Sequence, residues 1–308
     1  MRGTLAYIAA FIGVCGHASS EFVAKIADTP GPEFSVWRFM IGGLALVILS
    51  QLWPGARDLI TPLRRDGLKI AALSCIAMAM AQLVFHWALD FTSVVQVATV
   101  VTAIPIFFVL IDRLVNGTPL TPPKMVSGVG AFIGVALLLT NGFEADLGLA
   151  GPDLFGTVLA LLSALGGGAY LVLSKPLVAK YGPVRMTTYT FGIGFVFLWI
   201  VVGTAWGVWV NPLSLADKTP QQVSAILTIG IWNTCIGFAL WVWGVSAAPD
   251  SQRANYLFFL KPVIAALLAV VILGDVLTLF QILAIFAICF CVCLEYIWTM
   301  RRNAKLGA

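Results

Sequence analysis

Charged residues are scarce in this chain of 308 residues: Asp, Glu, Lys and Arg together make up 10% of it, whereas 60% is hydrophobic. Soluble domains carry about 25% charged residues, which help to cover their surface. A soluble protein of this composition would expose large apolar areas to water, so the sequence predicts a polytopic membrane protein. The basic residues are dispersed among connecting segments, and the net charge of +4 therefore gives no sign of nucleic-acid binding.

Histidine and cysteine are too few and too scattered to indicate metal or disulfide chemistry. The chain has two histidines and six cysteines, and every cysteine falls inside an apolar segment. No paired Cys-x-x-Cys motif occurs, so we expect neither a disulfide framework nor a metal site. The sequence also lacks an HExxH motif and a serine nucleophile elbow, and its glycine-rich stretches follow no predicted strand. We therefore expect no enzymatic activity and no cofactor.

Long apolar runs, by contrast, follow one another along the whole sequence. A helix needs about 20 apolar residues to cross the hydrocarbon core of a bilayer. The first run is longer than the core of a signal peptide, and further runs of similar length follow it, separated by proline- and glycine-rich stretches. We predict an all-α membrane protein with ten transmembrane helices at residues 4–27, 33–53, 68–89, 93–115, 122–141, 153–174, 186–209, 221–245, 252–273 and 277–299.

The distribution of lysine and arginine predicts the orientation of these helices. If the N-terminus is cytoplasmic, fourteen basic residues fall on the cytoplasmic side, and only Lys25 and Lys218 fall on the other side. Arg38 and Lys261 lie within predicted spans. Because cytoplasmic loops carry an excess of basic residues, we expect both termini to be cytoplasmic and the protein to lie in the inner (plasma) membrane of the cell.

Two segments of the chain resemble each other at an offset of 157 residues. Residues 98–121 align with residues 255–278, and this alignment places Pro105 opposite Pro262. The two segments also occupy equivalent places in the order of predicted spans. The alignment therefore indicates an internal duplication.

We expect the duplication to comprise two five-helix repeats, residues 1–145 and 146–308. Because five is an odd number, the second repeat enters the membrane from the opposite side. Inverted repeats are typical of secondary transporters, whose substrate site lies near the membrane midplane and which rock one set of helices against another.

At this point the sequence resembles a known family. The features that carry the resemblance are the 5+5 pattern of spans, proline segments in the fourth and ninth helices, Arg38 early in the second helix, and the step Gly274-Asp275-x-Leu277-Thr278. Together they resemble the drug/metabolite transporter (DMT) superfamily, EamA type, over almost the whole chain. The resemblance implies transport of amino acids, other metabolites or drugs, and it is nearly silent about which substrate.

Lys261 is the most conspicuous polar residue in the predicted spans. It lies nine residues into the ninth span, about 14 Å deep at ~1.5 Å per residue, near the centre of a core roughly 30 Å thick. A charge there costs ~2.5–3.5 kcal/mol, so its side chain should face protein or water. Pro262 leaves the carbonyl of Phe258 without its helical donor, and Pro105 has the same effect in the fourth span.

We interpret Lys261 as binding an anionic group of the substrate, such as a carboxylate, at a site shaped by the two prolines. Three other interpretations stay open. The lysine could be structural and paired with a buried acid, it could snorkel along its stem, or it could titrate during transport.

A second group of polar residues is predicted in the outer third of the first repeat: Glu21, Lys25, Arg38, His86 and Asp90. They form either an ion-pair network or a proton-coupling site and outer gate in which Glu21, His86 or Asp90 titrates. His86 and Trp243 lie 157 residues apart near opposite faces, which would make them counterparts in an outer and an inner gate. His17 lines a cavity or bonds between helices.

Five further polar or aromatic residues lie deeper in the predicted spans: Gln82, Trp232, Asn233, Tyr256 and Phe259. As a set they would line a pocket for an apolar or aromatic body with one polar end. For each of them, ordinary packing is the alternative.

We therefore expect a secondary transporter that works by alternating access, exports amino acids or related carboxylates, and is coupled to protons. The expected partners are a small-molecule substrate, membrane lipids and protons, with no nucleic acid, and the chain would act as a monomer or homodimer. One alternative is an exporter of cationic drugs such as quaternary ammonium compounds, with Glu21 or Asp90 as the counter-charge. Another is a membrane scaffold or sensor that transports nothing.

Overall fold

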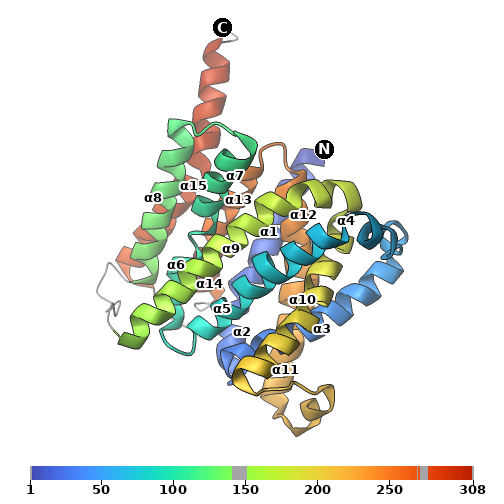
Figure 1. The fold of residues 1–308 in the computed structure, drawn as a ribbon. Coiled ribbons are helices and arrows are strands. Elements are labelled where there is room, and N and C mark those ends of the chain that lie inside the picture. The colour runs from blue at the N-terminus through green and yellow to red at the C-terminus, as the bar shows by residue number, and fades with distance from the viewer. Residues whose placement is uncertain (1, 141–150, 269, 271–276, 307–308) are drawn as a thin grey trace.

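The computed structural model describes residues 2–140, 151–268, 270 and 277–306, and all regular structure in these ranges is helical (Figure 1). In a bilayer every backbone N–H and C=O must be satisfied internally, and apolar helices meet that requirement. Eight helices in the described ranges are long and apolar enough to cross a membrane: Gly3–Ala24, Gly31–Leu52, Thr61–Ala88, Gln96–Asn116, Pro122–Leu139, Pro152–Tyr181, Pro183–Trp206 and Pro220–Ala247. The fold is thus that of a multi-pass membrane protein.

The last two predicted spans differ from the other eight. The ninth is divided into α13 (Ser251–Tyr256), the 3-10 helix η5 (Leu257–Leu260) and α14 (Lys261–Leu268). The tenth is α15 (Leu279–Leu306), whose apolar part, Leu279–Leu294, is shorter than a full span. The total of ten spans and the cytoplasmic location of the termini therefore stay predictions.

The first predicted repeat contains eight α-helices, because several of its spans are broken: α1 (Arg2–Ala18), α2 (Ser20–Ile26), α3 (Gly31–Leu52), α4 (Thr61–Ala72), α5 (Met80–Ala88), α6 (Val94–Val101), α7 (Ile104–Asn116) and α8 (Pro122–Leu139). The described part of the second predicted repeat adds four more α-helices before α13: α9 (Gly151–Tyr181), α10 (Pro183–Trp206), α11 (Pro220–Thr228) and α12 (Ala239–Ala247).

Short helices of other types connect these elements or interrupt them. The connecting 3-10 helices are η1 (Pro54–Ala56) and η3 (Pro212–Asp217), and the π-helices η2 (Leu73–Ala79) and η4 (Ile229–Phe238) interrupt the third and eighth predicted spans. Shifted by the 157-residue offset of the sequence, η2 falls inside η4. The break between α6 and α7 likewise falls on η5. These irregularities matter because π turns and helix breaks are frequent at functional sites.

Proline and glycine mark many of the helix ends. Proline stands in the first turn of α3, α7, α8, α10 and α11, where the missing N–H costs no hydrogen bond. Gly117 and Gly207 end α7 and α10 with φ angles of 68° and 71°, the left-handed conformation that glycine adopts without strain. The breakers that separate the apolar runs in the sequence thus also separate the helices.

The helices pack in pairs that cross between the two predicted repeats. α1 packs on η4 and α12, α9 packs on η2 and α5, α3 packs on α10, and α8 packs on α15. Between α1 and η4 the contact is backbone to backbone, because a Cβ added to Gly16 would lie 2.9 Å from the Cα of Gly237. Small residues at such crossings let helix backbones approach closely in membranes.

The start of α1 and the end of α15 lie at the top of Figure 1, whereas α2 and α11 lie at the bottom. We call these the termini side and the far side of the helix bundle. The bundle interior between them holds the polar residues described next.

Candidate functional site

A small cavity of about 30 Å³ lies inside the bundle, and we call it the inner cavity. Its lining comes from both predicted repeats: His17, Ser20, Arg38, Met78, Gln82, Phe85, Val101, Ile104, Ser163, Gly167, Phe238, Trp241, Phe258 and Lys261. This volume holds roughly one water molecule, since about 10–15 Å³ of such space suffices for one. The cavity must therefore widen before it can admit a larger molecule.

Lys261 is the first residue of α14, and its side chain lines the inner cavity at 4% exposure. Its Nζ lies 5.6 Å from the ring centroid of Phe258 and 5.8 Å from that of Phe85, within reach of cation–π attraction. The carbonyl of Phe258 is not the free acceptor that we expected, because the N–H of Lys261 donates to it at the end of η5. The 3-10 turn thus supplies the donor that Pro262 removes.

Arg38, on α3, lines the same cavity as Lys261 and is almost completely buried. Its Nε donates to Thr234 Oγ1 at 3.0 Å and its Nη1 donates to Gln82 Oε1 at 2.6 Å. Two hydrogen bonds therefore fix the plane of the guanidinium. The sequence had grouped Arg38 with the outer residues, whereas the structure brings it to the inner cavity.

Two ring nitrogens in the cavity lining are buried and have no hydrogen-bond partner in the described ranges: Nε2 of His17 and Nε1 of Trp241. The two rings lie edge to face, with centroids 4.9 Å apart. Trp241 is buried beside His17. The indole nitrogen can only donate, so a guest in this cavity would have to supply an acceptor.

Two cations, Arg38 and Lys261, line the inner cavity, and among the lining residues that the structure describes there is no Asp or Glu. Buried charges are strongly disfavoured unless a counter-charge or hydrogen bonds compensate them. An anionic group that reached this cavity would meet the donors of both side chains.

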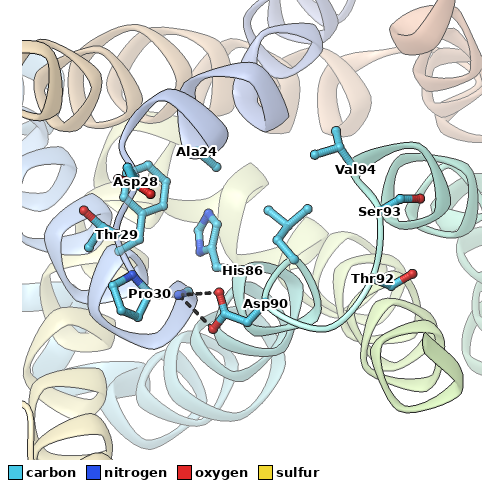
Figure 2. Close-up of a pocket in the computed structure, with 12 residues that line it drawn as sticks. Ala24, Asp28, Thr29, Pro30, His86, Asp90, Thr92, Ser93 and Val94 are labelled. Carbon is cyan, nitrogen blue, oxygen red and sulfur yellow. Dashed lines mark hydrogen bonds between the residues drawn. The ribbon is translucent and has the colours of Figure 1, made fainter. Parts of the chain in front are cut away.

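A larger hollow of about 320 Å³ opens on the far side, between the α2–α3 and α5–α6 connections, and we call it the far-side pocket (Figure 2). Its lining residues are Ala24, Asp28, Thr29, Pro30, Gly31, Phe34, His86, Leu89, Asp90, Thr92, Ser93 and Val94. Among the lining residues that the structure describes there are two acids, Asp28 and Asp90, and no Lys or Arg.

Asp90 is bound to the pocket wall, because both of its carboxylate oxygens accept from the backbone N–H of Gly31, each at 3.0 Å (Figure 2). Burial raises the pKa of Asp90 above its ordinary value, although the N–H of Gly31 works in the opposite direction. A carboxyl group with a raised pKa takes up a proton more readily than a fully hydrated one.

His86 projects into the middle of the far-side pocket (Figure 2). Its Nδ1 lies 2.8 Å from Ser35 Oγ, and its Nε2 is buried without a hydrogen-bond partner in the described ranges. Asp90, four residues further on, lines the same pocket. The structure thus brings together two of the three residues that the sequence proposed for proton coupling.

A polar network that the sequence did not predict joins helices on the termini side. We call it the termini-side network, and its residues are Asp112, Lys124, Asp250, Gln252 and Tyr256. Lys124 Nζ lies 3.0 Å from Asp250 Oδ2 and donates to Gln252 Oε1 at 2.8 Å. Gln252 Nε2 in turn donates to Asp112 Oδ2 at 3.1 Å. Tyr256 OH donates to the carbonyl of Lys124 at 2.7 Å. These bonds join α7, α8 and α13 at one end of the bundle.

Asp250 is the acid of the ion pair in this network. Burial would raise its pKa, but the N–H of Arg253 and the ammonium of Lys124 together hold that pKa below its ordinary value. A signal for the network existed in the sequence, because Asp112 is an acid inside the apolar run of the fourth span. Nothing in the sequence showed its partner Gln252, which is 140 residues away.

The remaining predicted pocket residues do not gather at the inner cavity. Tyr256 belongs to the termini-side network, and Phe259 is buried beside it. Asn233 is buried between η4 and α1, where its Nδ2 donates to Ser19 Oγ at 3.0 Å. Trp232 is 40% exposed and lines neither hollow. Of this predicted set, only Gln82 lines the inner cavity.

The predicted gate and helix-break residues are placed as follows. Trp243 lines a groove near the termini side, and Pro105 and Pro262 are buried in the first turns of α7 and α14. The side chain of Glu21 lies outside the described part of the structure. The same holds for Gly274 and Asp275 of the step that follows the ninth predicted span.

A family model described as the EamA-like transporter family matches the chain twice, over residues 4–140 and 154–296. Among curated proteins, the chain is 25% identical to the uncharacterized transporter YyaM of Bacillus subtilis, a match that covers 81% of this chain and 79% of that protein. It is 24% identical to a protein of Streptantibioticus cattleyicolor named "Probable terminal-alkyne amino-acid exporter", over 79% of this chain and 76% of that protein.

A protein of known crystal structure has the same fold. It superposes with a TM-score of 0.79 at 18% sequence identity, and the match covers 96% of this chain and 98% of that chain. At this identity the likeness concerns the arrangement of the helices and not the bound substrate.

Proposed function

Because the chain belongs to the EamA-like transporter family, we propose that it is a secondary transporter that moves a small carboxylate-bearing metabolite across the inner membrane by alternating access. The observation that carries this proposal is that Arg38 and Lys261 both line one buried cavity. The proposed role of these cations is to bind the carboxylate of the substrate.

Each polar residue of the inner cavity has a distinct role in this proposal. Lys261 supplies a compact positive charge, whereas Arg38, held by Gln82 and Thr234, offers a fixed planar donor group. The unpartnered Nε1 of Trp241 adds a donor for a further oxygen of the substrate, and Nε2 of His17 adds a second polar contact. Hydrogen bonds to charged groups are worth roughly 1.5–3 kcal/mol, more than neutral ones.

Several features support a chain of ten spans in two inverted repeats. The family model matches each half separately. The π-helices η2 and η4, and the breaks in the fourth and ninth spans, recur at the 157-residue offset. The packing of α1 on η4 and α12 has its counterpart in the packing of α9 on η2 and α5, as a two-fold exchange of the halves requires. Inverted repeats would let the two halves alternate in closing either side of the membrane.

The two ends of the bundle fit one stage of such a cycle. The termini-side network joins three helices at one end, and the far-side pocket opens the other end. In the proposal this stage is open to the far side. The opposite stage would require the bonds of Lys124 to break.

An amino acid or related carboxylate is the substrate class that we favour, with export as the direction. The Streptantibioticus relative, named for amino-acid export, supports this choice. Because the inner cavity is lined by two cations, the carboxylate is the end of the substrate that we propose to bind there. Proton coupling would fall to Asp90 or His86 in the far-side pocket.

One observation favours a second candidate function. Asp28 and Asp90 both line the far-side pocket. Export of a cationic drug would use these acids as counter-charges. Substrate binding that depends on Asp90 and not on Lys261 would support this candidate.

Flux measurements in proteoliposomes test the proposal. Purified protein would be reconstituted and assayed with amino acids, organic acids and quaternary ammonium cations. We expect saturable carboxylate flux that Lys261→Ala abolishes and that Lys69→Ala, which changes an exposed lysine, leaves intact. Absence of flux for every anion would reject the proposal, and flux of cations alone would replace it with the second candidate.

A further inference from the structure

A groove separate from the inner cavity and the far-side pocket lies near the termini side, and we call it the lateral groove. It has a volume of about 610 Å³ and runs between the end of α3, the start of α10 and the η4–α12 helix. Leu49, Ile236 and Leu240 supply apolar surface, while Trp53 and Trp243 supply aromatic rings. None of these residues has a role in the proposed transport route.

The depth of the lateral groove follows from the helices that form it. Leu49 and Trp53 lie at the end of the candidate span Gly31–Leu52, and Pro183 begins the candidate span Pro183–Trp206. Trp53, which is 61% exposed, and Trp243 are the residue type that gathers where hydrocarbon meets headgroups. The groove therefore extends from the headgroup level into the apolar part of the membrane.

The polar end of the groove is positive. Arg185 lines it from the first turn of α10, and its Nε is buried without a hydrogen-bond partner among the described residues. α10 is 24 residues long and begins after Gly182 with no side-chain cap, so its N-terminal N–H groups and dipole add positive potential at the same place.

The acid that acts electrostatically on Arg185 forms no ion pair with it. Asp58 acts electrostatically on Arg185, but its Oδ1 accepts from the backbone N–H groups of Ile60 and Thr61, and the residue is exposed to solvent. No ion pair joins Arg185 to an acid in the described ranges. A guest in the groove would therefore meet an apolar channel that ends in an anion-binding group.

We propose that the lateral groove binds one anionic phospholipid. Its acyl chain lies against Leu49, Ile236 and Leu240, and its headgroup phosphate lies at Arg185 and the N-terminus of α10. A lipid with net negative charge is selected over a zwitterionic one, whose ammonium group would be repelled by the same positive potential. The site is independent of the transported substrate.

Fluorescence quenching by brominated lipids tests the site in purified, detergent-solubilised protein. Phosphatidylglycerol and phosphatidylcholine with identical brominated acyl chains would be titrated separately. The double variant Trp53→Phe/Trp243→Phe lacks both tryptophans of the groove. Its quenching measures the background from the other eight of the ten tryptophans. We expect groove quenching at about fivefold lower concentration of phosphatidylglycerol, as expected for one basic residue near an anionic lipid. Equal quenching by both lipids would overturn the proposal.

Two arginine variants assign the selectivity to the polar end of the groove. Arg185→Gln should reduce the preference for phosphatidylglycerol to near unity, whereas Arg64→Gln, an exposed arginine outside the groove, should retain it. A preference that survives in Arg185→Gln overturns the assignment. If Arg185→Gln does not fold, the comparison of the two lipids on the unmodified protein still decides whether the groove is selective.

Discussion

The two hollows of the bundle differ in size, charge and origin. The far-side pocket has about 320 Å³ and holds Asp28 and Asp90, whereas the inner cavity has about 30 Å³ and holds Arg38 and Lys261. The first is lined largely by the connections between helices, and the second by side chains that point inward from the helices themselves. In the proposed transport cycle, this difference would separate the place where a molecule enters from the place where its charge is bound.

The chemistry of each hollow follows from the backbone around it. At a helix start, free N–H groups are available, and the N–H of Gly31 at the start of α3 binds the carboxylate of Asp90. In the middle of the bundle the backbone groups are used up within helices, so side chains must satisfy one another or a guest. Arg38 accordingly donates to Gln82 and Thr234, and Lys261 lies near the aromatic rings of Phe85 and Phe258.

The largest expected effect comes from removing the charge of Lys261. Lys261→Ala should weaken binding of the transported carboxylate by about 2–5 kcal/mol, or roughly 30-fold and more in Kd, because the anion loses a desolvated partner. Scintillation-proximity binding to purified protein measures this. Lys261→Arg keeps the charge and should retain part of the affinity. Unchanged carboxylate affinity in Lys261→Ala would show that the inner cavity does not bind the carboxylate of the substrate.

The next effect concerns the second cation. Arg38→Lys keeps a positive charge but loses the planar donor group, so Thr234 or Gln82 is left without its partner. We expect the free energy of unfolding to fall by ~1–3 kcal/mol. Carboxylate binding should also weaken, by about tenfold.

Thermal melting with and without substrate separates these two effects of Arg38→Lys. A variant that melts earlier but gains the same stabilisation from substrate would show that Arg38 positions helices and does not bind the anion. The ligand-dependent shift is the decisive readout, because a ligand stabilises only the state that it binds.

A smaller effect is expected from a change in the termini-side network. The side chains of Lys124 and Asp250 are 13% and 26% exposed, so their pairing should be worth on the order of 1 kcal/mol. Lys124→Ala should therefore raise the population open to the termini side by about fivefold. Distances between spin labels on the termini-side ends of α1 and α7 report that population. If the distances do not change, the network is not a closure.

The smallest effect is the pH dependence due to Asp90. Because burial raises the pKa of Asp90 in the folded protein, the folded state binds a proton more tightly than the unfolded state. Its contribution to stability is then greatest at low pH, declines as the pH rises from about the ordinary value of 3.8, and levels off above the raised pKa. Asp90→Asn should flatten this part of the stability profile, as thermal melting across pH can check.

The same variant tests the proposed proton coupling. If Asp90 carries the proton, Asp90→Asn should also flatten the pH dependence of transport, whereas Asp28→Asn in the same pocket should leave it unchanged. A transport profile that keeps its shape in Asp90→Asn would shift the proposed coupling role to His86.

Much of this architecture could be predicted from the sequence, because the bilayer imposes a simple rule on composition and length. The apolar runs became helices, and the charge of Lys261 inside one of them correctly predicted a side chain buried in protein. The family resemblance, drawn from loose motifs and the 5+5 pattern, is confirmed by the matching family model.

The errors arise where helices depart from regular geometry. Phe259 was expected to line the substrate site, but η5 winds as a 3-10 helix, and Phe258 faces the cavity instead. A 3-10 turn advances by a third of a turn per residue, so it rotates the neighbours that a 3.6-residue helix would present. Trp241, which the sequence did not indicate as a lining residue, follows the π-helix η4 and also lines the inner cavity.

Contacts between residues far apart in the sequence were the other feature that could not be predicted. Arg38 bonds to Thr234, 196 residues away, and no local pattern reports such a contact. The sequence placed Arg38 by its depth alone and so grouped it with the outer residues. Rotation about the helix axis, which depends on the partner helix, decides which hollow a side chain reaches.

The close approach of Gly16 to Gly237 limits how the bundle can move. The two backbones touch without side chains between them, so a change of rotamer cannot make room for sliding. We therefore expect α1 and η4–α12 to move as one rigid unit. A motion that widens the inner cavity must therefore bend the chain outside the contact between Gly16 and Gly237. A single methyl group added at Gly16 would push α1 and η4 apart and displace the residues on both helices.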